Sequence, residues 1–199
     1  MSNKAKIAVL VSGGGTNLQA LINAEKSGII SSGEIKLVIS NNEGAYALER
    51  AKKANISSVV CSKKILGDDF EDTLIEILED NEIDIIVLAG FMCILSEKFT
   101  SHFANRILNV HPSLIPSFCG KGFYGLHVHE AALEYGVKVT GATVHFVNEI
   151  PDGGKIIMQK AVYIKDDDTP ETLQRRVMEE AEWKILPMSV EKVCKEIKG

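Results

Sequence analysis

Asn109, His111 and Asp152 are the side chains whose types and spacing best suit acid–base chemistry. Asn109 and His111 end an apolar run and stand two residues apart, so an extended backbone points both toward one face. Pro112 then ends the strand, and about forty residues later Asp152 occupies a Pro-Asp-Gly-Gly turn that can hold a carboxylate in place. A hydrogen-bond donor, an imidazole and a carboxylate could therefore form one catalytic site. The alternative is ordinary packing, since a single His after a strand is more often structural than catalytic.

A Gly-rich stretch at residues 12–18, Ser-Gly-Gly-Gly-Thr-Asn-Leu, connects an expected strand to an expected helix. Glycines let the backbone turn tightly and present successive N–H groups at a helix N-terminus, which suits one phosphate. The dinucleotide-binding fingerprint is incomplete, because Leu18 stands where its third glycine would be, and no Gly-Lys-Ser/Thr of a P-loop follows. The alternative is a turn that serves only the strand-to-helix geometry.

Residues 88–95, Leu-Ala-Gly-Phe-Met-Cys-Ile-Leu, follow another expected buried strand. An apolar loop with a glycine at the edge of a sheet could form a slot for a flat ring, with backbone groups reading the polar edge of that ring. Taken alone, these residues favour ordinary core packing over a ligand slot.

The other histidines give weaker indications of function. His127 and His129 stand beside Glu130 at an expected helix start, but imidazoles two positions apart diverge on a helix, and no His-Glu-x-x-His pattern occurs. We therefore expect no metal site. His145 lies between two apolar residues on an expected strand, where we interpret it as a partly buried histidine with a structural role.

Short Val- and Ile-rich segments alternate with helical patterns along the first half of the chain. Repeated βαβ units predict an α/β fold, and we expect a single domain over 1–199 with a Rossmann-like, doubly wound, mostly parallel sheet. Two later strands should extend the sheet antiparallel, and a terminal helix should begin at Thr169-Pro170 and be kinked or divided by Pro187. The expected strands cover 6–12, 36–40, 58–61, 84–89, 137–147 and 155–164, and the expected helices cover 17–26, 45–55, 68–82 and 128–135.

The composition excludes several classes of protein. The 199 residues carry a net charge of −5, and Lys and Arg are nowhere concentrated as a nucleic-acid-binding surface requires. The N-terminal apolar run, residues 7–11, is too short for a signal peptide or a membrane span, and the 4 cysteines include no Cys-x-x-Cys pair. We expect a cytoplasmic protein with free thiols and small-molecule ligands, without nucleic-acid or membrane partners, as a monomer or homodimer.

Four motifs in this order and spacing resemble the glycinamide ribonucleotide formyltransferases of purine synthesis. They are the Gly-rich stretch at 12–18, Leu-Ala-Gly-Phe-Met at 88–92, Asn-Val-His-Pro-Ser-Leu-Ile-Pro at 109–116 and Asp-Gly-Gly at 152–154. The resemblance runs from Lys6 to Pro187. It implies transfer of a formyl group from 10-formyltetrahydrofolate to the amine of glycinamide ribonucleotide, with no metal and no covalent enzyme intermediate.

The resemblance also implies roles for individual residues. The catalytic Asn, His and Asp of the family fall on Asn109, His111 and Asp152, and Asp152 should raise the pKa of His111 and keep it protonated. The implied contacts to the ribonucleotide are Gly15, Thr16, Asn17 and Glu182. The implied contacts to the folate are Met92, Cys93, Ile94, Leu95 and Asn109. Phosphate binding would belong to an N-terminal half ending near residue 105, and folate binding with catalysis to the remainder.

Two features depart from the family pattern. Cys93 stands where many relatives carry Arg, and the loop at 117–125 is longer than the corresponding loop in several relatives. The glycines of this loop suggest either a mobile flap over the site or a mere surface insertion.

Rival functions stay open at this point. A 10-formyltetrahydrofolate hydrolase would use the same Asn, His and Asp chemistry, although its relatives add an N-terminal regulatory domain. A nucleotide-binding oxidoreductase would need the missing fingerprint and a ribose-binding acid where Ser40-Asn41-Asn42 stands. The remaining alternative is a protein that binds a nucleotide without catalysis.

Overall fold

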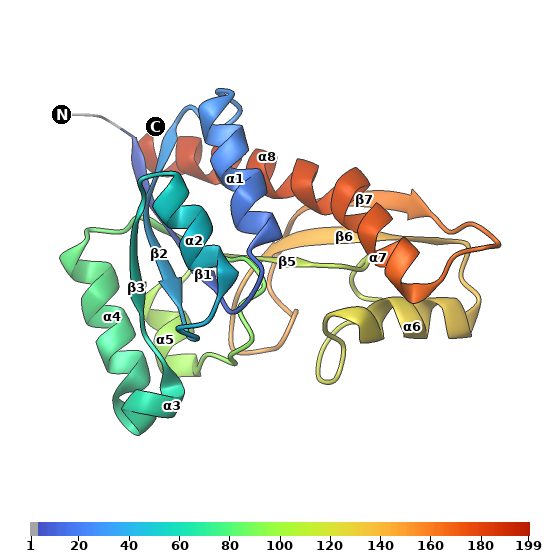
Figure 1. The fold of residues 1–199 in the computed structure, drawn as a ribbon, viewed down its shortest axis with the longest axis horizontal. Coiled ribbons are helices and arrows are strands. Elements are labelled where there is room, and N and C mark those ends of the chain that lie inside the picture. The colour runs from blue at the N-terminus through green and yellow to red at the C-terminus, as the bar shows by residue number, and fades with distance from the viewer. Residues whose placement is uncertain (1–3) are drawn as a thin grey trace.

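The strands and helices follow the predicted order, with two short unpredicted helices, α3 and α5. The computed structural model describes residues 4–199. The strands are β1 (Ala5–Val11), β2 (Gly33–Ser40), β3 (Ser57–Val60), β4 (Ile85–Leu88), β5 (Ile107–His111), β6 (Val139–Phe146) and β7 (Ile156–Tyr163). The helices, shown in Figure 1, are α1 (Thr16–Lys26), α2 (Tyr46–Lys53), α3 (Lys63–Leu66), α4 (Phe70–Asp80), α5 (Glu97–His102), α6 (Leu126–Tyr135), α7 (Pro170–Val177) and α8 (Trp183–Lys198).

The seven strands form one sheet in the order β3-β2-β1-β4-β5-β6-β7. The first five strands in this order pair in parallel, whereas β6 pairs antiparallel with both β5 and β7. Each connection between the parallel strands passes through at least one helix, as a parallel crossover requires. The topology confirms the predicted doubly wound sheet with an antiparallel C-terminal extension.

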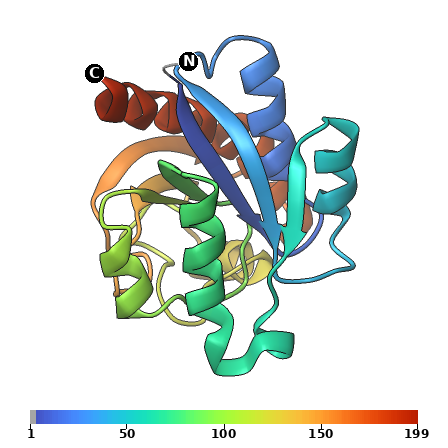
Figure 2. The ribbon, with the colours of Figure 1, turned by 90° about the vertical axis from the view of Figure 1, so that its left-hand side faces the viewer.

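Helices cover both faces of the parallel part of the sheet (Figure 2). Alternate residues of β1 point to opposite faces. Ile7 and Val9 belong to the core that includes α1 and α8, whereas Ala8 and Leu10 belong to the core that includes α4 and α5. Because all four side chains are fully buried, β1 is a continuous apolar run rather than an alternating one.

The carboxyl ends of β1, β4 and β5 lie side by side, since these strands are neighbours that run in the same direction. The Gly-rich stretch, the apolar loop after β4 and the residues after His111 therefore gather at one edge of the sheet. Open α/β sheets bind their ligands at this edge.

Pro187 lies inside α8, so the predicted division of the terminal helix at this residue is wrong. The irregular turn lies upstream, where Met178–Glu182 forms a π-helical turn between α7 and α8. A proline ring crowds the carbonyl four residues earlier, here that of Trp183, and the wider turn ends just before Trp183. Such turns occur often at functional sites, and Glu182 is the last residue of this one.

Glu191 of α8 joins the C-terminal helix to the turn before β2. Its carboxylate accepts hydrogen bonds from the N–H groups of Ser31 and Ser32, both at 2.9 Å, and from their hydroxyls at 2.8 and 2.9 Å. Burial raises the pKa of Glu191, but the hydrogen bonds from these serines and from Lys195 outweigh burial and lower the pKa to about 2.

We predict that Glu191→Gln lowers the free energy of unfolding by about 2 kcal/mol at neutral pH, because an amide accepts fewer of these hydrogen bonds. Since the folded-state pKa of Glu191 is depressed, its stabilisation is present above the unfolded pKa and is lost as pH falls from 4.5 toward about 2. Denaturant unfolding should show that the difference in free energy of unfolding between wild type and variant becomes smaller as the pH falls across this range. Glu196→Gln, at an exposed position on the same helix, is the matched control. A difference that does not change with pH would contradict the assignment.

Candidate active site

The Asp152 carboxylate lies between two imidazoles near the carboxyl end of β5. Its Oδ2 atom lies 3.5 Å from Nδ1 of His111, and its Oδ1 atom lies 3.6 Å from Nε2 of His145. The backbone N–H of Gly120 donates to Oδ2 at 2.8 Å. The exposed fractions of the Asp152, His111 and His145 side chains are only 13%, 5% and 2%. The tertiary structure thus brings His111 and Asp152 into reach of each other and adds a second histidine.

A tight turn aims Asp152 at this point. Asp152 adopts a left-handed φ of 56°, which Asp tolerates better than most residues, and the Gly153 N–H closes the turn on the Ile150 carbonyl at 2.9 Å. A Cβ atom on Gly154 would lie 1.7 Å from the Phe146 carbonyl oxygen. Glycine is therefore required there to let the turn pack directly against the end of β6.

His145 orients the amide of Asn109. The two residues lie directly opposite each other in the antiparallel pairing of β5 and β6, with Nδ2 of Asn109 3.3 Å from Nε2 of His145. Nδ1 of His145 lies 2.7 Å from the Phe146 carbonyl, which can only accept, so Nδ1 carries a proton. Nε2 of His145 faces both the Asn109 amide and Oδ1 of Asp152, and the Asn109 N–H that does not face His145 is left for a ligand.

His111 is less basic than the sequence suggested. Burial lowers its pKa, and the opposing effects of the Asp152 charge and of the Phe118 carbonyl do not restore the usual value. The prediction of a raised pKa is therefore wrong, because burial outweighs the nearby carboxylate. Nε2 of His111 lies 2.8 Å from the Phe118 carbonyl oxygen and must donate to it.

Asp152 keeps its charge despite its burial. Burial raises the pKa of Asp152, but hydrogen bonds from His145 and from the Gly120 N–H, with the charges of both histidines, outweigh burial and lower it. A buried charge requires such partners. The site therefore holds one anionic group among largely neutral ones.

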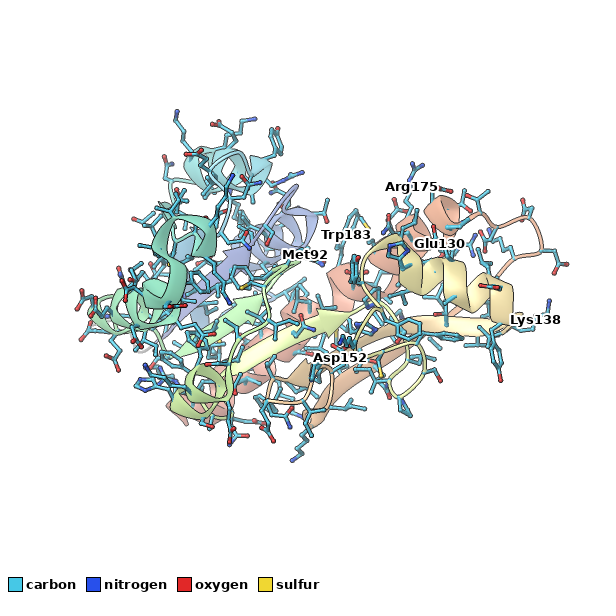
Figure 3. All side chains as sticks on the ribbon, turned by 90° about the horizontal axis from the view of Figure 1, so that it is seen from below. Met92, Glu130, Lys138, Asp152, Arg175 and Trp183 are labelled. Carbon is cyan, nitrogen blue, oxygen red and sulfur yellow. The ribbon has the colours of Figure 1, made fainter. Side chains whose placement is uncertain are left out.

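Two hollows meet at Phe91 and Asn109. The first, of about 280 Å³, extends toward the Gly-rich stretch and is called here the Gly-loop pocket. The second, of about 150 Å³, extends along the apolar loop after β4 and is called the apolar slot. Figure 3 shows Met92, which lines the Gly-loop pocket, and Asp152, which lines the apolar slot, near the middle of the molecule.

The Gly-loop pocket is rich in polar atoms. It is lined by Thr16, Asn17, His111, His129 and Glu182, among others, and Nδ2 of Asn17 donates to Oε2 of Glu182 at 2.8 Å. Burial raises the pKa of Glu182 to about 7, although the Asn17 hydrogen bond opposes this shift. Oδ1 of Asn17 and both ring nitrogens of His129 have no hydrogen-bond partner within residues 4–199. A polar ligand could therefore form hydrogen bonds with groups that are already removed from water.

Gly15 lies behind the Gly-loop pocket rather than in its lining. It is the residue before α1, with a left-handed φ of 70°, and a Cβ atom there would come within 2.7 Å of the Ala47 side chain. Both the backbone conformation and the packing thus require glycine. The N–H groups of the first helical residues, including Thr16 and Asn17, lack acceptors within the helix and suit an anion.

The apolar slot contains three of the four residues expected in the loop after β4. Cys93, Ile94 and Leu95 line it together with Val147 and residues 148–152. Burial raises the pKa of Cys93, so it offers the slot a neutral thiol. Met92 instead lines the Gly-loop pocket, and its N–H donates to Oγ of Ser12 at 2.7 Å.

Two histidines in the site were not predicted from the sequence. His145 was interpreted as structural, yet it contacts both Asn109 and Asp152. The sequence did contain a signal, because Thr143 and His145 alternate on one strand as Asn109 and His111 do on another. Interpreting this signal required the register in which the two strands pair. His129 is fully buried in the Gly-loop pocket, and burial, with the charge of His111, lowers its pKa to about 4.

His127 diverges from His129, as predicted. It is exposed and lies 2.9 Å from Oε2 of Glu130. Within residues 4–199 no group of three or more His, Cys, Asp or Glu side chains could hold a metal ion. No helix in the same part of the chain is long and apolar enough to cross a membrane.

The loop at 117–125 forms part of the site. The Phe118 carbonyl contacts His111 and the Gly120 N–H contacts Asp152. Phe118 itself adopts a φ of 48°, an uncommon conformation for a bulky residue. These contacts with His111 and Asp152 favour a role in the site over a mere surface insertion.

The fold is an α/β sheet, and its candidate functional side chains gather at the carboxyl edge of that sheet. The formyl transferase family model matches residues 5–190. The chain is 45% identical over 187 residues to phosphoribosylglycinamide formyltransferase of Haemophilus influenzae, covering 93% of this chain and 85% of that protein. It is 46% identical over 195 residues to the trifunctional purine biosynthetic protein adenosine-3 of Gallus gallus, covering 97% of this chain but only 19% of that protein.

Solved structures agree with the sequence relatives. Glycinamide ribonucleotide transformylase 1 from Symbiobacterium toebii superposes with a TM-score of 0.90 at 39% identity, covering 98% of this chain and 90% of that one. The chain belongs to the formyl transferase family. It spans about a fifth of the length of the trifunctional relatives that it matches.

We predict that Glu182→Gln stabilises the protein at alkaline pH. Because the folded-state pKa of Glu182 is raised to about 7, the wild type loses stability as pH rises from 4.5 through 7, by up to about 3 kcal/mol, and an uncharged Gln does not. Thermal unfolding from acid to alkaline pH would measure this. The exposed Glu179→Gln, three residues earlier, is the control. Parallel curves for wild type and Glu182→Gln would show that Glu182 is not neutral in the folded protein.

Proposed function

We propose that this protein transfers the formyl group of 10-formyltetrahydrofolate to the amino group of glycinamide ribonucleotide, in de novo purine synthesis. The observation that carries the proposal is the convergence of Asn109, His111 and Asp152 where a polar pocket meets an apolar slot. The names of the relatives from H. influenzae and S. toebii support the acceptor substrate. The products would be formylglycinamide ribonucleotide and tetrahydrofolate.

The Gly-loop pocket suits the ribonucleotide. The N-terminus of α1 can bind the phosphate through backbone N–H groups, and the lining contains no Lys or Arg among the described residues. The unpartnered Oδ1 of Asn17 and ring nitrogens of His129, with a neutral Glu182 nearby, match a ligand bearing several hydroxyl groups. The amine would then point toward Asn109 and His111.

The apolar slot suits the ring end of the folate. Its apolar side chains, including Ile94, Leu95 and Val147, can cover the faces of a flat heterocycle, and the backbone of residues 148–152 can read its polar edge. A volume of about 150 Å³ holds only the ring, so the rest of the donor would extend outward over the surface. Cys93 replaces a cationic side chain of many relatives with a thiol, which removes one charge attraction for the donor.

The proposed transfer is direct. The amine nitrogen attacks the formyl carbon, the carbonyl oxygen gains negative charge, and the nitrogen gains positive charge. The free N–H of Asn109 can donate to the oxygen, and a donor of this kind contributes about 3 kcal/mol to transition-state stabilisation. Asp152 accepts the proton of the amine through water and returns a proton to the leaving N10 atom of the folate as the C–N10 bond breaks. No nucleophilic side chain is needed.

His111 must change its hydrogen bonding for this reaction. In the structure its Nε2 proton is held by the Phe118 carbonyl, so the loop at 117–125 has to release it before it can reach the formyl oxygen. Negative charge that develops on this oxygen favours the protonated imidazole and so opposes the effect of burial on the pKa of His111.

In the proposed function the chain is one domain, and two segments serve the half of the site that was assigned to the other half of the chain. Thr16 and Asn17 of the N-terminal half would bind the phosphate, but Glu182 reaches the same pocket from the C-terminal half. The loop after β4, in the N-terminal half, lines the slot for the donor.

The first experiment measures release of tetrahydrofolate from 10-formyltetrahydrofolate with and without glycinamide ribonucleotide. Release that depends on the ribonucleotide supports the transferase. Equal release in both reactions would establish a hydrolase instead, and no release in either would favour a nucleotide-binding protein without catalysis.

We predict that Asp152→Asn lowers kcat by about 100-fold to 10,000-fold, because the amide cannot accept the proton. The variant should remain folded, since Asn still accepts the Gly120 N–H at one oxygen. Steady-state kinetics with a circular dichroism spectrum would check both points. Asp166→Asn, at a fully exposed carboxylate, is the matched control. Near-normal turnover in Asp152→Asn would contradict the proton-accepting role of Asp152.

Asn17→Ala should raise KM for the ribonucleotide by about tenfold while leaving kcat and KM for the folate nearly unchanged. The change removes a desolvated acceptor, Oδ1, that the Gly-loop pocket offers to the ligand. Initial rates with each substrate varied in turn would separate the two KM values. A rise confined to KM for the folate would place the ribonucleotide elsewhere.

A further inference from the structure

A third hollow lies next to the Gly-loop pocket but outside the proposed reaction site. It has a volume of about 410 Å³, larger than either hollow at Asn109, and lies between α1 and the start of α8. Thr16, Gln19, Ala20, Arg50 and Trp183 are part of its lining, and we call it the α1/α8 hollow. Only Thr16 also lines the Gly-loop pocket. The volume is in the range of pockets that bind small organic molecules.

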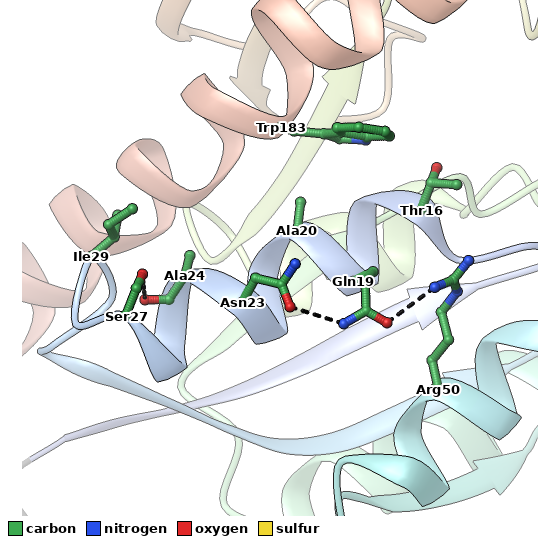
Figure 4. Close-up of a pocket in the computed structure, with 9 residues that line it drawn as sticks. All are labelled: Thr16, Gln19, Ala20, Asn23, Ala24, Ser27, Ile29, Arg50 and Trp183. Carbon is green, nitrogen blue, oxygen red and sulfur yellow. Dashed lines mark hydrogen bonds between the residues drawn. The ribbon is translucent and has the colours of Figure 1, made fainter.

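The shape of the α1/α8 hollow suits a flat ring. Figure 4 shows the indole of Trp183 lying above α1, with the small side chain of Ala20 directed toward the face of the ring. Ala24 is the next lining residue along the same side of the helix. Small residues opposite an indole leave room for an aromatic ring to stack on it, an arrangement that contributes beyond the area it buries.

The polar groups at the rim of the hollow favour an anion. Arg50 donates from Nε to the Gly14 carbonyl at 2.8 Å and from Nη1 to Oε1 of Gln19 at 3.0 Å, while Nη2 has no hydrogen-bond partner within the described part of the chain. The guanidinium is therefore held in place with one donor edge unused. None of the lining residues is acidic, in a chain with a net charge of −5.

Two further donors lack partners at the same place. The amide of Asn23 receives a hydrogen bond from Gln19 at its Oδ1 atom, at 3.0 Å, and its own N–H groups are unused by residues 4–199. Nε1 of Trp183 is buried without a hydrogen-bond partner among these residues. A stacking face, unpaired donors and a fixed cation together define the chemistry of the ligand.

We propose that the α1/α8 hollow binds a flat heteroaromatic ring that carries an anionic group, the chemistry of a nucleoside monophosphate. The ring stacks on Trp183 above Ala20, and the anionic group pairs with Arg50. Because Thr16 forms a wall of both hollows, occupancy weakens binding in the Gly-loop pocket by placing a second anion beside the first. Only this last consequence rests on the proposed function.

Fluorescence titration tests the proposal directly, because Trp183 is the only tryptophan of the chain and lines this hollow. Adenosine monophosphate is the probe. Adenosine, which lacks the anion, and ribose 5-phosphate, which lacks the ring, are the matched controls. We expect saturable quenching by the monophosphate, with apparent affinity at least about tenfold weaker for each control, a difference of about 1.4 kcal/mol. An absence of saturable quenching would overturn the proposal.

Two variants separate the α1/α8 hollow from the Gly-loop pocket. Ala20→Leu fills the space beneath the indole and should abolish the quenching, whereas Asn17→Ala alters only the other pocket and should leave it intact. The reverse pattern would mean that the monophosphate binds in the Gly-loop pocket, and the proposal would be wrong. If Ala20→Leu does not fold, Arg50→Gln replaces it. That variant should weaken the monophosphate about tenfold and leave adenosine unchanged.

The kinetic consequence is measured separately. At saturating adenosine monophosphate, KM for glycinamide ribonucleotide should rise in the wild type and not in Ala20→Leu. An enzyme that quenches as expected but transfers no formyl group would refute the proposed function and leave the hollow as a ligand site. An active enzyme without quenching would refute the hollow and leave the function in place.

Discussion

The arrangement of the site depends on one buried carboxylate. Asp152 contacts His111 at the end of β5, His145 on β6 and the Gly120 N–H in the loop between them, so two strands and their connecting loop meet at two oxygen atoms. A charge removed from water is tolerated only when such partners replace its hydration. The left-handed turn at Asp152 and the side-chain-free backbone of Gly154 are the local means of bringing that carboxylate against β6. Because an unpaired buried charge is unfavourable, the hydrogen bond from the Gly120 N–H to Asp152 also restrains the loop at 117–125.

Burial, rather than nearby charge, decides the protonation of most other groups in the site. It lowers the pKa of His111 and His129 and raises that of Glu182, which leaves Asp152 as the main fixed charge there. A cleft of this kind has little positive potential of its own, so an anionic ligand must be bound mainly by backbone N–H groups. Neutral groups near their transition between protonation states are also able to respond when a reaction creates charge beside them.

The π-helical turn and the residue that follows it contribute to the Gly-loop pocket and to the α1/α8 hollow. Glu182, its last residue, lines the Gly-loop pocket, and Trp183, the next residue, covers the α1/α8 hollow. The same irregular turn therefore presents an acid to one hollow and an indole to the other, with Thr16 of α1 between them. A shift of α8 relative to α1 would alter both hollows together, which gives the fold a direct physical route for coupling them.

Local signals in the sequence determined the order of strands and helices, the parallel sheet with its antiparallel extension, and the likeness to formyltransferases. Continuous apolar strands, glycines at turns and the position of Pro112 act over a few residues, so they can be interpreted without the fold. Only the tertiary structure decided that His145 faces Asn109, that Met92 lines the Gly-loop pocket, that burial lowers the pKa of His111 and that α8 continues through Pro187. Strand register, burial and the path of a loop depend on residues distant in sequence. Protonation follows from these three, and for that reason it could not be deduced from the spacing of His111 and Asp152.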